Sequence, residues 1–543
     1  MLFLFLLVHS VSMAQNVAVS GTVTDDAGEP LPGVTVTLVG QTTTGTITNI
    51  DGIYQLEVPA NGQLNFRYIG FMQQTVDVNG RTSIDVVLKP DLVGLDEVVV
   101  IGYGTQRKEA VTGSVASVEG EQMREVASSD ITQALQGRVA GVEMSQTSTK
   151  PGATMQIRIR GTRSLNASND PLVVLDGIPF AGSISDISPS DIKSVDILKD
   201  ASATAIYGSR GANGVILVTT NKGYKGQKAT FSFNSYYGIK DAIEFPMMSG
   251  PEFAALRAAR GQYSNSLEES DETDTNWQEL LYRTGIVTSN DLGISGGMEK
   301  GSYSFGIGYY KDEAVLPGQE YERISLRASL DQEIGEYIRV GFSSNNSYSV
   351  SDGNNLGLYS TLSASPLVDP YNEDGTWKRT IKMPSDEQFL YSREIIEGLG
   401  DKWIDQDKAY GTYNNVYGEI KIPGVEGLKY RANVGLNLRT VNGGAYTGEG
   451  VFSINPATES TASINNSLNI NWAIENLLTY DHVFADKHHL NVVALYSAEE
   501  TSYNSSYIAA RDMPADHFQF YNLGRADGEI TINPDYQGSG DWY

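Results

Sequence analysis

The chain has 543 residues, a formal net charge of −27, no cysteine and 5 histidines, which are His9, His482, His488, His489 and His517. The acidic balance argues against binding to a nucleic-acid backbone, which needs clustered Lys and Arg. The missing cysteine excludes disulfide bonds, thiolate metal sites and a cysteine nucleophile. No histidine lies between positions 10 and 481, which excludes a histidine-based zinc site or catalytic triad there.

Residues 1–14 have the pattern of a signal peptide. Residues 2–8 are a short apolar run, and Ser12-Met13-Ala14 follows as a small-x-small cleavage pattern. The run is too short to cross a bilayer as a helix. No Lys or Arg precedes Arg67, so the basic region of a signal peptide is missing, and we expect the start of translation a few residues upstream. The alternative is a buried N-terminal strand.

Residues 18–90 are a run of short β-rich segments separated by turn residues, which predicts a small β-sandwich. The β-rich segments include residues 34–39, 54–58, 64–68 and 84–88, and the turns lie at 25–28, 30–33, 51–52 and 61–62.

The same segment resembles the carboxypeptidase-D regulatory-like domain. The resemblance is carried by Gly21-Thr22-Val23, Pro32-Gly33-Val34, residues 48–54 and Tyr68-Ile69-Gly70-Phe71. It implies an accessory module and not a peptidase, because the metal ligands of those peptidases lie in another domain and this segment has no histidine.

Residues 95–106 combine an acidic pair, a β-branched run from Val98 to Ile101, and glycines. A single extended strand is a liability unless something pairs with it. The segment is therefore a candidate for strand addition to the sheet edge of a partner. The alternative is an ordinary strand of the neighbouring domain.

Residues 107–223 mix helices and strands. A helix is predicted from a cap at Ser129-Asp130 to Gly141, a short helix from Ser190-Asp191-Ile192, and a helical turn over 201–207. Strands are predicted at residues 155–161, 172–175, 195–198 and 215–220.

This stretch resembles the plug domain of TonB-dependent receptors. The matching pieces are residues 135–142, 157–161, 174–179, 191–201 and 205–216, in the family's order. The candidate plug-motif residues are Gly137, Arg138, Gly141, Arg158, Arg160, Gly161, Asp176, Gly177, Tyr207, Gly208, Arg210, Gly211, Asn213 and Gly214.

The order of regulatory-like domain, strand segment and plug is similar to the SusC-like branch of that family. By this resemblance the strand segment is the TonB box, and its TonB-binding residues are Leu95, Asp96, Glu97, Val98, Val99, Val100 and Ile101. The resemblance implies no cofactor and no metal.

Residues 224–543 alternate apolar and polar residues strictly, for example over 303–309, 324–331, 428–439 and 468–475. Apolar residues would face lipid and polar ones a wet lumen, so the pattern predicts an antiparallel transmembrane β-barrel. The alternative is a set of soluble sandwiches with one wet face. No stretch after the apolar run at 2–8 approaches 18 consecutive apolar residues, which excludes a transmembrane helix.

The connections between these strands differ in length. Tight turns are predicted at Gly301 and Gly335-Glu336, and long polar segments at 263–288 and 351–410. Short helices are predicted over Pro251–Arg260 and Trp277–Tyr282. Tight turns on one side and long loops on the other are typical of outer-membrane barrels.

About ten strand candidates follow residue 224, whereas plugged transporter barrels have about 22 strands. An open edge in lipid is not tolerated. We therefore expect an incomplete barrel and a truncated gene product or fragment.

Two local patterns resemble metal-binding sites, and both are better interpreted as turns. His488-His489 is predicted to lie in a turn, because adjacent strand residues point to opposite faces and could not share a metal. Residues 372–375 resemble part of a calcium loop but are predicted to be a simple turn, because Tyr371 occupies a ligand position.

The family resemblance leads us to expect that four arginines hold the plug against carboxylates of the barrel wall: Arg158, Arg160, Arg163 and Arg210. Substrate contact is the alternative.

The resemblance implies TonB-driven import of a glycan, oligosaccharide or peptide across the outer membrane. It implies TonB, a SusD-like lipoprotein and outer-membrane lipid as partners, with no nucleic acid. The alternatives are a TonB-dependent signalling receptor and a surface adhesion protein. No enzymatic motif is present, so the chain is predicted not to be an enzyme.

Overall fold

The computed structural model describes two compact units, which divide at Val98. The described residues are 16–25, 28–39, 45–68, 71, 73–88, 98–101, 104–107, 114–125, 131–166, 168–180, 182–261, 265–266, 268–382, 387–452, 458–485 and 488–542. The predicted signal peptide, the first three residues of the predicted TonB box and the predicted cap at 129–130 lie outside them.

The N-terminal unit is a β-sandwich, as predicted. Its strands are β1 Asn16–Thr24, β2 Thr35–Leu38, β3 Gly45–Ile47, β4 Ile53–Pro59, β5 Gln63–Arg67, β6 Gln74–Asp77 and β7 Val86–Val87. They form two sheets, in the orders β4-β1-β7 and β3-β2-β5-β6. Every second residue points inward, and Val19, Tyr54 and Phe66 are buried in one shared core.

The division between the units falls after the first residue of strand β8 Val98–Ile101. Strand β8 pairs with β9 Gly104–Arg107 in a separate two-stranded sheet. The plug proper follows as a five-stranded sheet in the order β10-β15-β16-β13-β14 and a hairpin of β11 and β12. Its strands are β10 Val115–Glu119, β11 Val142–Gln146, β12 Met155–Ile159, β13 Leu172–Leu175, β14 Ile178–Pro179, β15 Ile192–Leu198 and β16 Val215–Thr220.

Short helices connect these strands. They are α1 Gly120–Arg124, α2 Ile131–Leu135, η2 Ile184–Asp186, η3 Pro189–Asp191, α3 Ala201–Thr204 and η4 Ala205–Asn213. The helix predicted to begin at Ser190 is wrong: a single 3-10 turn ends at Asp191, and β15 starts at Ile192. Strand β15 pairs with β10 on one side and β16 on the other, so sheet pairing overrides the local capping signal.

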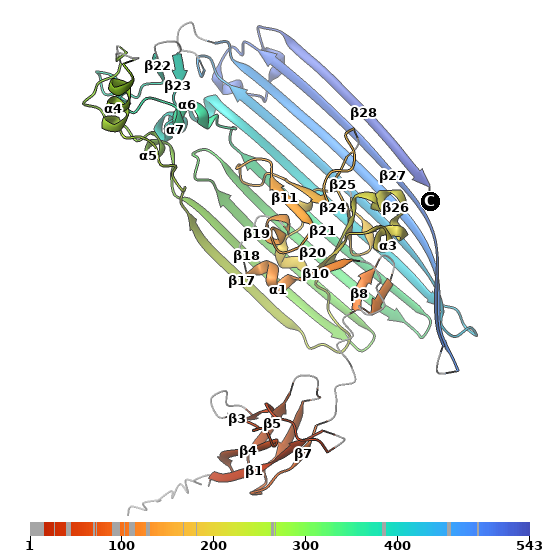
Figure 1. Cartoon of the computed structure of the whole chain (residues 1–543). Helices are drawn as coiled ribbons and strands as arrows, with labels where there is room; N and C mark the ends of the chain where they lie inside the picture. The colour runs from red at the N-terminus through yellow and green to blue at the C-terminus, as the bar shows by residue number, and fades with distance from the viewer. Residues whose placement is uncertain are drawn as a thin grey trace, which may run out of the picture. The chain divides into compact units, whose positions relative to one another are not determined.

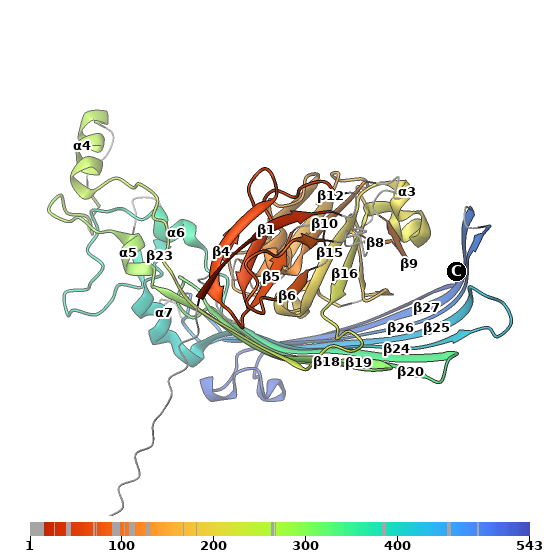
Figure 2. The same cartoon turned by 90° about the horizontal axis from the view of Figure 1, so that it is seen from below.

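The remainder of the chain forms one ten-stranded antiparallel sheet, here called the wall (Figure 1). Its strands, in order, are β17 Thr230–Lys240, β18 Gly285–Met298, β19 Gly301–Glu313, β20 Glu320–Ile334, β21 Ile338–Asp352, β24 Trp403–Lys421, β25 Leu428–Thr447, β26 Thr461–Phe484, β27 His488–Arg511 and β28 Ile530–Trp542. Figure 2 shows that the wall is curved and that the plug strands lie on its concave side.

The connections at one end of the wall are short, at 299–300, 335–337, 422–427 and 485–487, which confirms the predicted turns at Gly301 and Gly335. Most connections at the other end are long and hold α4 Gly250–Arg260, α5 Trp277–Leu281, α6 Leu358–Leu362, β22 Thr380–Lys382, β23 Glu387–Phe389, α7 Arg393–Leu399, η5 Gly400–Lys402, η6 Asp516–Phe518 and η7 Leu523–Arg525. The helices predicted near 251–260 and 277–282 are therefore confirmed.

The prediction of a turn at His488-His489 is wrong. The pairing of β26 with β27 extends to Phe484 opposite His488 and Val483 opposite His489, so both histidines belong to strand β27. Within the described residues, no group of three or more His, Asp or Glu side chains could hold a metal ion, and no helix is long and apolar enough to cross a membrane.

Candidate functional site at the interface of plug and wall

The wall has an inverted distribution of polarity. Its outward side chains are exposed and apolar, and they include Phe305, Ile307, Ile324, Leu326, Val434, Leu436 and Ile474. Its inward side chains are polar and buried, and they include Ser304, Ser325, Arg327, Asn433, Asn437, Asn471 and Glu475. A water-soluble domain buries its apolar face instead, whereas a membrane-spanning strand turns it to lipid.

Many contacts of the plug with the inner face of the wall come from residues 179–180 and 182–191, which we call the wall-contact segment. Asp191 ends η3 and accepts a hydrogen bond from Arg327 Nε of β20 at 2.9 Å. Arg327 Nη1 also donates to the carbonyl oxygen of Asn221. Only 8% of the Arg327 side chain is exposed, so a charged group that is costly to bury is matched by an opposite charge.

Asp186 forms a second contact of this kind. Its carboxylate accepts hydrogen bonds from the Tyr413 hydroxyl of β24 and from Arg439 Nε of β25, the latter at 3.0 Å. Arg323 Nη1 donates to the carbonyl oxygen of neighbouring Ser185 at 2.6 Å. In these contacts of Asp186, Asp191 and Ser185, the wall supplies the cations and the hydroxyl, and the wall-contact segment supplies the carboxylates and a carbonyl oxygen.

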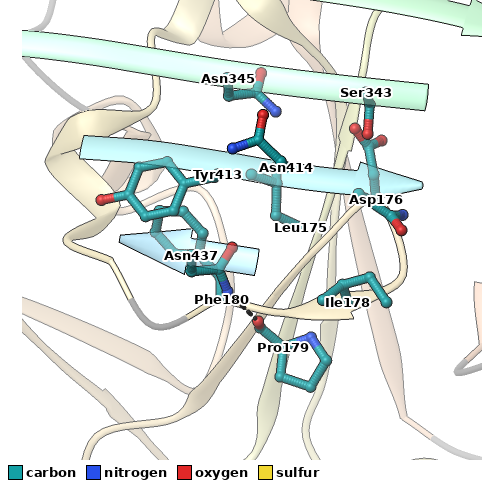
Figure 3. A pocket seen from close by; sticks show the side chains of 11 residues that line it. Leu175, Asp176, Ile178, Pro179, Phe180, Ser343, Asn345, Tyr413, Asn414 and Asn437 are labelled. Carbon is teal, nitrogen blue, oxygen red and sulfur yellow. Dashed lines mark hydrogen bonds between the residues drawn. The ribbon is translucent and has the colours of Figure 1, made fainter. Parts of the chain in front are cut away.

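Beside these contacts, the hairpin of β13 and β14 meets the amide-rich face of β21, β24 and β25 (Figure 3). Asn437 Nδ2 donates to the carbonyl oxygen of Pro179 at 3.1 Å, and the rings of Phe180 and Tyr413 lie 4.4 Å apart. The gap left between them holds about 10 Å³, which is room for about one water molecule. The hairpin is thus packed closely against the wall.

A larger cavity of about 260 Å³ lies between the wall-contact segment and β17 to β20. Its polar lining includes Ser190, Asp191, Asn234, Asp291 and Arg327. Ser190 Oγ donates to Asp291 Oδ1 at 2.7 Å. Burial raises the pKa of Asp191 above its usual range, although Arg327 lowers it. The cavity has the chemistry of a hydrated gap at the interface.

The arginines expected to hold the plug behave differently from one another. Arg210 forms an ion pair with Glu499 of β27, as predicted. For Arg158 and Arg163 the prediction is wrong: Arg158 pairs with Asp170 at 2.6 Å and Arg163 donates to the carbonyl oxygen of Ala212, both within the plug. Arg160 is exposed.

Sequence reasoning missed the wall arginines as plug contacts. Arg327 and Arg439 fall on the polar positions of the alternation at 324–331 and 428–439. This position is a usable signal, because a buried cation needs an opposite charge beside it. The partners, Asp191 and Asp186, sit in 3-10 turns that no periodicity marks.

The plug-motif residues have structural roles that follow from backbone geometry. Asp176 and Gly177 have φ angles of 51° and 94° in the turn between β13 and β14, which suits an Asp-Gly hairpin turn. The Asp176 carboxylate accepts from Thr220 Oγ1 at 2.7 Å and from Lys222 Nζ at 3.2 Å. A Cβ at Gly214 would lie 2.7 Å from Ile159 Cδ1.

The other motif residues fit the same account. Several have positive φ angles, namely Gly137, Gly141, Arg160, Gly161 and Gly208, and a Cβ at Gly211 would lie 2.8 Å from the carbonyl oxygen of Thr204. Arg138 forms an ion pair with Glu125, and Asn213 donates to the carbonyl oxygen of Ser168. Tyr207 is buried.

Of the predicted TonB box, Val98–Ile101 form β8, so the strand prediction is confirmed for that part. Leu95, Asp96 and Glu97 lie outside the described residues. TonB binding by residues 95–101 stays a prediction.

Two parts of the chain match known family models. Residues 107–215 match the TonB-dependent Receptor Plug Domain, and residues 19–100 match the CarboxypepD_reg-like domain.

Relatives match over most of the chain. TonB-dependent receptor P3 of Formosa agariphila is 35% identical over 98% of this chain and 53% of its own length. TonB-dependent receptor SusC of Bacteroides thetaiotaomicron is 37% identical over 59% of this chain and 32% of its own length. The chain spans about half the length of the first of these curated relatives and about a third of the length of the second.

The solved structure of the RagAB peptide importer in the open-open state has the same architecture. It matches with a TM-score of 0.68 and 25% identity, over 82% of this chain and 53% of that chain.

Proposed function

From its similarity to the SusC-like TonB-dependent receptors of the outer membrane, we propose that the protein imports a nutrient across that membrane under the control of TonB. The cargo is a glycan, an oligosaccharide or a peptide. Residues 95–101 pair as a strand with TonB, and a pull on them changes the plug so that cargo passes along the wall.

One observation carries the proposal. The wall turns apolar side chains outward and buries its polar face against a plug, through charged contacts such as Arg327 with Asp191 and Arg439 with Asp186. A plugged wall of this kind suits a gated pore. An adhesion protein made of stacked β-sandwiches would not contain a plug domain, whereas residues 107–215 match the plug model.

The proposed partners follow from the relatives. We propose a SusD-like lipoprotein on the outer side, which covers the long loops and delivers cargo. The signalling alternative keeps the same plug and wall, and differs in that gene expression, and not uptake, would depend on residues 95–101.

The test compares Val99→Pro with Val99→Ala in the native host. Proline removes the backbone donor that strand pairing needs, whereas alanine keeps it. The probes are a fluorescent oligosaccharide mixture and a fluorescent tryptic peptide mixture. We expect Val99→Pro to abolish uptake of one probe and Val99→Ala to retain it. Normal uptake of that probe by Val99→Pro would contradict TonB coupling through this strand, and loss of a transcriptional response alone would favour the signalling receptor.

A further inference from the structure

The inner face of strands β26 and β27 extends beyond the plug. Asn471 Nδ2 of β26 donates to Glu499 Oε1 of β27 at 2.9 Å, and Glu499 pairs with Arg210 of the plug. From this contact both strands continue toward the long connections, and their register does not shift up to Thr461 opposite Arg511. Because alternate residues of a strand point to the same face, every second residue beyond this contact also lies on the inner face.

Six side chains of this region form a group that we call the tyrosine-amide patch. They lie in three directly opposed pairs, which are Asn465 with Tyr507, Ser467 with Ser505, and Asn469 with Tyr503. The side of the wall that they occupy is the concave one, where the plug also lies (Figure 2). The exposed fraction is 39% for Tyr503 and 42% for Tyr507, whereas Asn471 in the plug contact is 1% exposed. Both tyrosine rings are therefore accessible from inside the wall.

The six side chains of the patch are uncharged, and all of them can form hydrogen bonds. Amides and hydroxyls supply both donors and acceptors, and a tyrosine ring adds an apolar face with a polar tip. Tyr503 and Tyr507 are four residues apart on one strand, which is about 13 Å. An extended ligand of several units can contact both rings. A sugar ring fits this chemistry, because it has hydroxyl groups around its rim and C–H groups on its faces.

Two charged residues border the patch, and both disfavour an anionic ligand. Arg439 of β25 already binds Asp186 of the plug at 3.0 Å. The carboxylate of Asp407 of β24 lies beside Gly443, and Gly443 is directly opposite Asn465 in the sheet. A carboxylate or sulfate on the ligand would therefore meet an acidic neighbour and a cation that is already paired, whereas such groups need a free cation to be bound strongly.

From this arrangement we propose that the tyrosine-amide patch binds a neutral oligosaccharide, and that such a glycan is the cargo. The rings of Tyr503 and Tyr507 stack on sugar rings, and the amides and hydroxyls between them bind sugar hydroxyl groups. A peptide fits less well, because its terminal carboxylate and acidic side chains would have no free cation in the patch. The inference rests on the proposed import function and narrows its cargo.

Equilibrium binding to the purified full chain in detergent tests the inference without TonB and without uptake. The neutral probes are fluorescently end-labelled oligosaccharides from starch, laminarin and mannan. The competitors are unlabelled acidic oligosaccharides from alginate and a tryptic peptide mixture. By fluorescence anisotropy, we expect at least one neutral probe to bind, and we expect neither competitor to displace it.

Variants then test whether the patch is the binding site. Tyr507→Ala removes a stacking surface and Asn465→Asp adds an acid among the sugar hydroxyls, so each is expected to raise the Kd of the bound probe about tenfold. Tyr507→Phe keeps the ring and should stay within about threefold of the native Kd. Tyr496→Ala is the matched control, because Tyr496 is a 58% exposed tyrosine of β27 on the outer face, and it should leave the Kd unchanged. Heat-modifiable migration on gels shows that each variant is folded.

Three outcomes would overturn the inference while TonB-dependent import stands: no binding of any neutral probe, displacement of the bound probe by peptides or acidic glycans, or an unchanged Kd in both Tyr507→Ala and Asn465→Asp. Normal uptake by Val99→Pro, with glycan binding intact, would instead contradict the proposed function and leave the binding site in place.

Discussion

At the scale of single residues, surroundings decide what a charge does. Arg158 and Arg327 each pair with one aspartate, at 2.6 Å and 2.9 Å. The Asp170 partner of Arg158 is 67% exposed, whereas the Asp191 partner of Arg327 is 15% exposed. Water screens the first pair and not the second. The second pair therefore fixes the plug to the wall, and the first contributes little.

Arg327→Ala is expected to lower the free energy of unfolding of the plug by about 3–5 kcal/mol, because it leaves the buried Asp191 without its ion-pair partner. Arg158→Ala is expected to cost less than about 1 kcal/mol. Protease cleavage of the plug in outer-membrane vesicles, as a function of urea, measures both. Equal resistance of the two variants would contradict the role given to Arg327.

Gly21 illustrates steric demand at one position. A Cβ there would lie 1.9 Å from the carbonyl oxygen of Ile84, which belongs to the neighbouring chain segment and cannot move as a side-chain tip does. Gly21→Ala is expected to destabilise the N-terminal unit by about 2 kcal/mol, measured by urea unfolding of that unit. Ser20→Ala, at the exposed position beside it, is the control and should change the free energy of unfolding little.

At the scale of elements, side chains of the wall strands alternate between the two faces of the sheet, and the apolar ones are exposed while the polar ones are buried. In β25, Leu436 is exposed and Asn437 is buried. The connecting segments follow the same division, with short turns at one end and folded loops at the other. Each strand is therefore built to separate two environments, lipid and polar interior, along its whole length.

Leu436→Arg is expected to impair assembly into the outer membrane, because a cation on the lipid face costs about 2–4 kcal/mol near the bilayer centre. Ile50→Arg is the matched control: Ile50 is also an exposed apolar residue, at 84%, but belongs to the N-terminal unit. Heat-modifiable migration of outer-membrane fractions on gels reports folding. A normal level of folded Leu436→Arg would contradict the lipid-facing assignment.

At the scale of the whole molecule, the chain contains two units with separate cores. The N-terminal unit closes its own core around Tyr54 and Phe66, whose rings meet edge to face at 5.3 Å. The second unit has a plug core and an outward apolar surface that water does not tolerate in so large a patch. The two units therefore need different solvents.

Residues 16–88 expressed alone are expected to fold as a water-soluble monomer, because the core is complete within them. Residues 99–543 are expected to need detergent. Circular dichroism and gel filtration of both fragments check this. A monomeric, detergent-free fold of the second fragment would remove the membrane interpretation altogether.

The sequence by itself determined the order of units, the strand alternation and the faces of the wall, because side-chain period and turn residues are local properties of the chain. The alternation over 324–331 and 428–439 also puts Arg327 and Arg439 on the polar face. Only the tertiary structure decided which charges meet across the interface. Asp186 contacts Arg439 and Arg210 contacts Glu499 across 253 and 289 residues of sequence, and no local pattern encodes such a pairing. For the same reason Ser190-Asp191 was misread as a helix start, since the strand that follows is fixed by partners far away in the chain.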